Sequence, residues 1–140
     1  TPEFERLYQK LSDREKEWIR PFGIISDEEK QALLSETEML LLPSRTDSFG
    51  IVLLEAWSYG RPVIGANAGG IPGVIDDGRN GLLVEFGDVL GLAGAIRQII
   101  ENPAQKAALG QAGLEKVNTV YQWEQVGDRV EAVYRRIIAS

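Results

Sequence analysis

Four apolar residues at positions 39–42 lead through a short polar loop into an apolar helical pattern over residues 49–59. An unbroken apolar run of this length is typical of a strand buried on both faces, as in a parallel sheet. Parallel strands are joined by crossover connections, which are usually helices and almost always right-handed. The segment therefore indicates an α/β fold in which a parallel sheet carries helices on both faces.

Strands and helices alternate along much of the remaining chain. We expect about four strands, over residues 18–22, 39–42, 61–66 and 82–84. We expect helices over residues 1–16, 26–36, 49–59, 88–101, 104–117 and 123–138. No linker or repeat divides the sequence, so residues 1–140 are predicted to form one domain. A doubly wound domain usually begins with a strand, whereas this chain opens on a helical pattern, so we expect a fragment of a longer protein.

Two short motifs predict where elements begin and turn. Ser26 and Glu29 have the spacing of a capping box, in which each side chain bonds the other residue's backbone N–H at a helix start. Residues 77–81, DGRNG, have strong turn chemistry because Gly and Asn tolerate the backbone conformations that tight turns need.

Composition limits the chemistry that is available. The net charge of −6 disfavours nonspecific binding to nucleic acid, so no nucleic-acid partner is expected. The absence of cysteine excludes disulfides, and the absence of histidine removes the commonest general base and transition-metal ligand. The acids at 76, 77, 85 and 88 lack the spacing of a calcium loop, so no metal is expected. Without a signal peptide or long apolar span, a cytoplasmic location is expected.

Two acids bracket the start of the central helix. Asp47 precedes it and Glu55 lies inside it, surrounded by apolar residues. A helix N-terminus after a parallel strand attracts phosphate, while carboxylates beside it suit hydroxyl groups. The two acids are eight positions apart, about 12 Å along a helix, which is comparable to the reach from a ribose across a diphosphate to a sugar. Gly50 would let the backbone approach such a ligand, so the set favours a sugar nucleotide.

Each acid also has a purely structural interpretation. Asp47 or Ser48 could simply cap the helix, because both residue types are favoured at that position. Glu55 could be a buried acid paired with an arginine or with backbone N–H groups, since an unpaired buried carboxylate is costly.

The segment from position 43 to 88 carries a resemblance: PSRTDSFGIVLLEAWSYGRPVIGANAGGIPGVIDDGRNGLLVEFGD. It resembles the C-terminal half-domain of the family 4 retaining GT-B glycosyltransferases (glycosyl transferases group 1). Their pattern is P-S-x-x-E-x-F-G-x-x-x-x-E-A, then G-x-P-V-I, a Gly-Gly-x-P-E loop and D-G-x-N-G-L-L-V. The resemblance covers roughly residues 22–140 and implies the Rossmann-like C-terminal half of a GT-B fold, truncated on its N-terminal side.

The resemblance also implies a donor site. Asp47 stands where the first acid of the family contacts donor-sugar hydroxyls, and Glu55 stands where the second holds the ribose. The donor-sugar residues would be Asp47, Ser48, Phe49 and Gly50, and the nucleotide-binding residues Ile25, Ile51, Val52 and Glu55. Backbone N–H groups of residues 48–51 would face the sugar and diphosphate. Such enzymes normally need no metal, because side chains and a helix N-terminus neutralise the leaving diphosphate.

The rest of the chemistry would lie outside this sequence. In the family, an N-terminal domain binds the acceptor, and cations upstream hold the diphosphate, so the catalytic set is incomplete here and the isolated chain should be inactive. Lys30, Arg45 and Arg61 are expected to be surface charges. The implied partners are a nucleotide-diphosphate sugar and the acceptor domain. An unpaired sheet edge would permit self-association, and the full-length protein could also be membrane-peripheral.

Two positions depart from the family pattern and keep alternatives open. Asp47 replaces the usual Glu and is one methylene shorter, and Gly73 replaces the Glu of the Gly-Gly-x-P-E loop. A non-catalytic sugar-nucleotide-binding module is one alternative. A GT-B sugar-nucleotide epimerase or a phosphorylase is another. The nucleobase, the sugar and the acceptor are not determined by the sequence.

Overall fold

The computed structural model describes residues 2–138 of the chain. These residues form two compact units, one ending at Lys30 and the other starting at Gln31, and each is described by itself. The division falls inside α3 (Asp27–Glu36), which the capping box predicted: Ser26 N donates to Glu29 Oε2 at 2.8 Å, and Glu29 N donates to Ser26 Oγ at 3.2 Å.

The N-terminal unit contains two short helices instead of the one predicted over residues 1–16. They are α1 (Pro2–Gln9) and α2 (Asp13–Lys16), and residue 1 lies outside the described part. The prediction was wrong because Ser12 starts a new helix: its side chain accepts from Glu15 N, while its own N–H donates to Glu15 Oε2 at 2.8 Å. This is a second capping box, and its S-x-x-E signature is visible in the sequence.

The strand predicted over residues 18–22 is wrong. This stretch has irregular structure, and the side chain of Trp18 is 85% exposed. A strand exists only where a neighbouring strand completes its backbone hydrogen bonds, and residues 2–30 contain no strand that could do so. The apolar character of this stretch alone therefore did not make it a strand.

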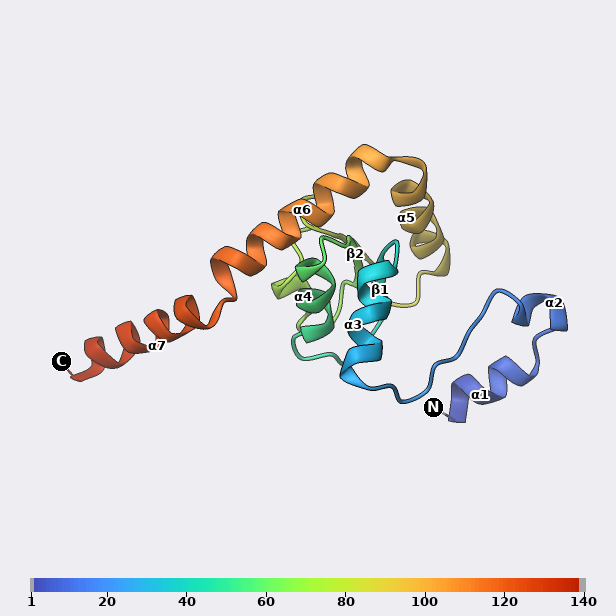
Figure 1. The fold of residues 1–140 in the computed structure, drawn as a ribbon, viewed down its shortest axis with the longest axis horizontal. Helices are drawn as coiled ribbons and strands as arrows, with labels where there is room; N and C mark the ends of the chain where they lie inside the picture. The colour runs from blue at the N-terminus through green and yellow to red at the C-terminus, as the bar shows by residue number, and fades with distance from the viewer. Residues whose placement is uncertain (1, 139–140) are drawn as a thin grey trace. The chain divides into compact units, whose positions relative to one another are not determined.

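The second unit is built on a parallel sheet (Figure 1). Its strands, in spatial order, are β1 (Leu40–Leu42), β2 (Val63–Ala66) and β3 (Leu82–Val84). Leu41 pairs with Ile64, and Gly65 pairs with Leu83. The described residues thus hold three strands where about four were predicted, because residues 18–22 do not join the sheet.

Helices cover both faces of this sheet, as the sequence predicted. In β2, which is fully buried, Val63 packs in a cluster with α4 (Ile51–Ser58), whereas Ile64 packs in a second cluster with α5 (Val89–Glu101). Successive side chains of a strand point to opposite faces, so α4 and α5 lie on opposite sides (Figure 1). The remaining elements are the 3-10 helix η1 (Ile71–Gly73), α6 (Pro103–Val120) and α7 (Trp123–Ile138).

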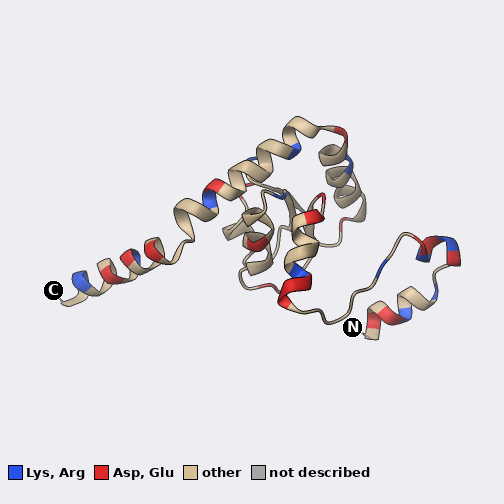
Figure 2. Cartoon of the chain, viewed as in Figure 1, with Lys and Arg blue, Asp and Glu red and all other residues tan. Residues whose placement is uncertain are grey.

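Lys and Arg are interleaved with Asp and Glu along α7 (Figure 2). Within residues 2–138, no helix combines the length and the apolar character that crossing a bilayer requires.

Candidate functional site

The loop between β1 and α4, residues 43–50, leaves the carboxyl end of a parallel strand, where open α/β sheets usually bind ligands. Gly50 is the N-cap of α4, with φ 76° and ψ 52°. The helix therefore begins at Ile51, later than predicted, and neither Asp47 nor Ser48 caps it. The capping alternative for these two side chains is wrong because a left-handed glycine makes the entry.

Gly50 is required by the fold itself. Its positive φ disfavours any residue with a side chain, and a Cβ there would lie 2.8 Å from Leu53 Cδ1 and 3.2 Å from Leu42 Cδ2. Leucine side chains therefore fill the space beside Gly50. This packing explains the glycine differently from the close approach of a ligand that the sequence suggested.

Asp47 holds the loop in shape and keeps part of its carboxylate available. It is half-buried, and its Oδ1 accepts from Phe49 N at 3.0 Å. Its carbonyl oxygen accepts from Gly70 N at 2.8 Å. Within the described residues, Oδ2 of Asp47 has no hydrogen-bond partner. The Phe49 N–H is thus used inside the loop in this structure, and its contact with a ligand stays a prediction.

The other residues around the helix entry differ in exposure. Ser48 is exposed and Val52 is half-buried. The Phe49 ring is 40% exposed and meets the Tyr121 ring edge-on at 5.8 Å, a contact that the sequence did not reveal. Ile51 is 66% exposed, so α4 is not buried on all sides as its composition suggested.

Glu55 lies on the second turn of α4 and is half-buried. The buried face of the same helix is formed by Leu53, Ala56 and Trp57, all 0% exposed. In the interval from Asp47 to Glu55, only residues 51–55 are helical, which corresponds to a rise of about 6 Å. The estimate of about 12 Å along a helix is therefore wrong, because it treated the whole interval as helical. Ile25, the predicted base contact, is half-buried in the N-terminal unit.

The three cations expected at the surface have different environments. Lys30 pairs with Asp27 at 3.3 Å, and Arg45 is exposed above the Phe86 ring at 5.7 Å. Arg61 is half-buried, and its guanidinium donates to the Ser35 carbonyl. The surface assignment of Arg61 is therefore wrong, because its partner is 26 residues away in sequence.

Two of the acids weighed as metal ligands bond the backbone instead. Asp77 Oδ1 accepts from Leu83 N at 2.8 Å, and Asp88 Oδ1 accepts from Gly91 N at 2.8 Å as the N-cap of α5. In the described part of the chain, no group of three or more Asp and Glu residues is placed to hold a metal ion.

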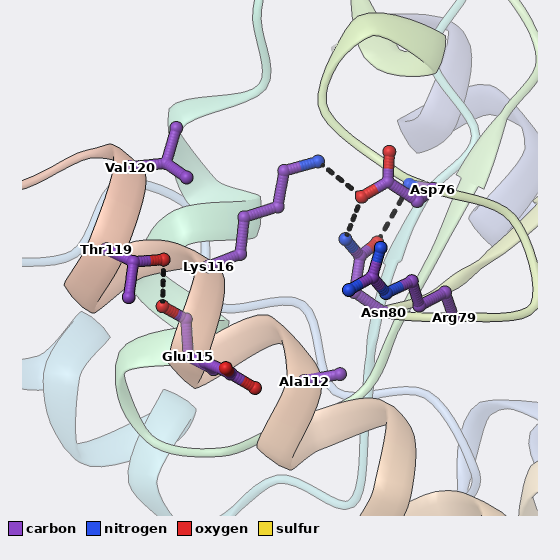
Figure 3. Close-up of a pocket in the computed structure, with 8 residues that line it drawn as sticks. All are labelled: Asp76, Arg79, Asn80, Ala112, Glu115, Lys116, Thr119 and Val120. Carbon is purple, nitrogen blue, oxygen red and sulfur yellow. Dashed lines mark hydrogen bonds and ion pairs between the residues drawn. The ribbon is translucent and has the colours of Figure 1, made fainter.

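A separate polar cavity of about 210 Å³ lies between α6 and the 76–81 turn (Figure 3). Lys116 Nζ donates to Asp76 Oδ2 and to the Val74 carbonyl, both at 2.7 Å. Asn80, which is 2% exposed, donates to Asp76 Oδ2 at 2.7 Å and accepts from Asp76 N at 2.8 Å. The hydrogen bond from Lys116 lowers the pKa of Asp76. These polar groups satisfy one another, so we interpret the cavity as a structural network.

The fold and the loop together define the class of protein, a Rossmann-like domain of the GT-B glycosyltransferase type. The family described as glycosyl transferases group 1 matches residues 2–116, and the chain belongs to this family.

This chain is similar to a D-inositol 3-phosphate glycosyltransferase of Nocardioides. The two are 37% identical over a match that covers 83% of this chain and 25% of that protein. The solved sucrose-phosphate synthase of Thermosynechococcus elongatus is 33% identical, with a TM-score of 0.81 over 97% of this chain and 34% of that one. The structure of the Anabaena protein HepE was solved with UDP-glucose, and it matches with a TM-score of 0.81 over 96% of this chain and 36% of HepE. Because the sequences are only 22% identical, this match shows the fold alone. The chain spans a quarter to about a third of these proteins.

Proposed function

We propose that this chain is the donor-binding domain of a retaining glycosyltransferase that moves a sugar from a nucleotide-diphosphate sugar to an acceptor. The observation that carries the proposal is the β1–α4 junction: a parallel strand, a loop with a partly free carboxylate, and a left-handed glycine that opens a helix. Family membership supports it. The names of the Nocardioides and Thermosynechococcus relatives describe glycosyl transfer, and HepE was solved with UDP-glucose.

In this proposal each part of the junction has a separate task. The first N–H groups of α4 have no intrahelical partner, so they and the helix dipole would stabilise the diphosphate charge. Asp47 Oδ2 would accept from hydroxyls of the donor sugar, while Glu55 would accept from the ribose hydroxyls. Within the described residues, the N–H groups of Ser48, Gly50 and Ile51 have no protein acceptor, which leaves them available to the ligand.

The remaining parts of the proposal concern the whole protein. The acceptor would bind to an N-terminal domain of the same chain, and Ile25 would contact the base. The donor would be held without a metal, because the helix entry supplies positive potential. We also propose a cytoplasmic location.

Calorimetric titration of the chain with UDP, GDP, ADP and UDP-glucose tests the proposed function. Glu55→Ala should weaken binding of the preferred nucleotide by about 1–3 kcal/mol, the range for a lost hydrogen bond to a charged group. Glu36→Ala, an exposed acid at the end of α3, is the matched control and should leave affinity unchanged. If Glu55→Ala binds as tightly as the parent chain, the proposed function is wrong.

A further inference from the structure

The loop that carries Asp47 contacts a second loop, residues 67–70, which follows the carboxyl end of β2. Gly70 N donates to the Asp47 carbonyl at 2.8 Å. A Cβ built on Gly70 would overlap the Ser48 carbonyl oxygen and lie 2.5 Å from the Ser48 carbonyl carbon. A Cβ on Gly69 would lie 2.5 Å from the Asp47 carbonyl oxygen. The two loops therefore touch backbone to backbone, with no room for a side chain between them.

Gly70 is a glycine only because of this lack of space. Its backbone, with φ −87° and ψ −8°, has a negative φ that residues with a side chain also adopt, for example in type I turns. Gly69 differs, because its φ of +59° would strain another residue even without the contact. Gly73, three residues further along, has no atom within 4 Å of a built Cβ and a φ outside the left-handed region. Gly70 and Gly73 are thus a matched pair that differs mainly in whether the site has space.

We propose that Gly70 is a positioning residue that sets where the Asp47 carboxylate and the Ser48 N–H meet the donor sugar. Its N–H fixes the Asp47 carbonyl, and its missing side chain lets the Ser48 carbonyl come close. The Asp47 carboxylate is in turn fixed by its bond from Phe49 N at 3.0 Å. The inference rests on the proposed function and deepens it by assigning a residue to the sugar end of the donor.

The effect should be confined to the sugar end. Glu55 is carried by α4, whose Leu53, Ala56 and Trp57 pack in the core, whereas a Cβ on Gly70 would meet the loop backbone at Ser48 and Phe49. A methyl group at position 70 would have to move the Ser48 carbonyl by roughly 1.5 Å to reach ordinary contact distance. A displacement of about 1 Å can already cost about a hundredfold when a group must meet a reacting ligand. The nucleotide end would stay in place while the sugar contacts are lost.

The test compares Gly70→Ala with Gly73→Ala in the complete chain. Dissociation constants are measured by calorimetry for UDP and UDP-glucose, with GDP and GDP-mannose, and ADP and ADP-glucose, as parallel pairs. We expect Gly70→Ala to weaken the preferred nucleotide sugar about tenfold or more relative to its nucleotide, and Gly73→Ala to change neither. A Gly70→Ala protein that keeps the parent ratio of the two constants, whether both are weakened or neither, overturns the inference.

A measurement on the unmodified chain covers the case in which Gly70→Ala does not fold, as judged by circular dichroism. The amide resonances of Gly69 and Gly70 should shift with the nucleotide sugar and not with the nucleotide alone, because they contact the backbone of Asp47. Equal shifts with both ligands, or none with either, overturn the inference. Glu55→Ala remains the separate test of nucleotide binding, so failure of the proposed function is distinguishable from failure at Gly70.

Discussion

The β1–α4 loop, which carries Asp47, and the polar network at Lys116 are stabilised in opposite ways. The β1–α4 loop is held mainly by backbone contacts with Gly69 and Gly70, and within residues 2–138 one Asp47 carboxylate oxygen and the N–H groups of Ser48, Gly50 and Ile51 have no protein partner. The network is held by charged and amide side chains that bond one another. In this chain, backbone contacts hold the β1–α4 loop without using all of its polar groups, whereas the polar side chains of the network use one another.

The two regions are connected through α4. Trp57 Nε1 donates to the Asn80 carbonyl at 2.9 Å, so the network holds the helix from its buried side. The β1–α4 loop lies at the N-terminal end of the same helix. Changes in the network should act on stability, whereas changes in the β1–α4 loop should act on the ligand binding that we propose for it.

The largest effect on stability is expected when the buried side chain of Trp57, which packs α4 into the core, is removed. Trp57→Ala removes a side chain that is 0% exposed and should lower the free energy of unfolding by about 3–5 kcal/mol, through lost burial and a cavity. Urea denaturation measures this change in the free energy of unfolding. Trp123→Ala, at a position that is 85% exposed, is the control and should cost less than about 0.5 kcal/mol. Similar losses for the two variants would contradict the described packing.

A smaller effect is expected at Asn80. Asn80→Ala removes a buried amide side chain, leaves the partly buried Asp76 N–H without its acceptor and should cost about 1–3 kcal/mol of stability. Nucleotide affinity, measured at a temperature where the variant is folded, should be unchanged. Asn118→Ala on the exposed surface of α6 is the control for amide removal. A loss of nucleotide affinity in folded Asn80→Ala would break the separation of the two regions.

The smallest effect concerns pH. The pKa of Asp76 is lowered in the folded state, chiefly by its hydrogen bond from Lys116, so its contribution is complete above the unfolded value of about 3.9 and is lost as pH falls through the lower folded pKa. The Asp76 side chain is 53% exposed, so the pair should contribute at most about 1 kcal/mol. The stability difference between the parent chain and Lys116→Met should shrink as pH falls below about 4. A difference that grows on acidification would contradict the pairing.

The sequence predicted those features that depend on local signals. The parallel sheet, the helices on both faces and the helix after Ser26 were predicted because apolar runs and caps are short-range patterns. The strand over residues 18–22 failed because a strand requires a partner. The single helix over residues 1–16 is wrong because the capping box of Ser12 and Glu15 starts a new helix at Asp13, a signal that is visible in the sequence.

The site was predictable in residue type and less so in geometry. Asp47 and Gly50 stand at the loop and helix entry as expected, yet the reason for Gly50 is its packing against Leu42 and Leu53. The contact between Gly70 and Ser48 joins residues that are distant in sequence, and no local pattern shows it. The partner of Arg61 was missed for the same reason.

Amide chemical-shift mapping of the labelled chain with UDP-glucose, alongside the GDP and ADP sugars, tests the central claim most directly. If the junction of β1 and α4 is the donor site, the largest shifts with the preferred ligand will fall at Ser48, Gly50, Ile51 and Glu55. Shifts confined to the network around Asp76 and Lys116 would contradict the assignment and make the polar cavity the binding site.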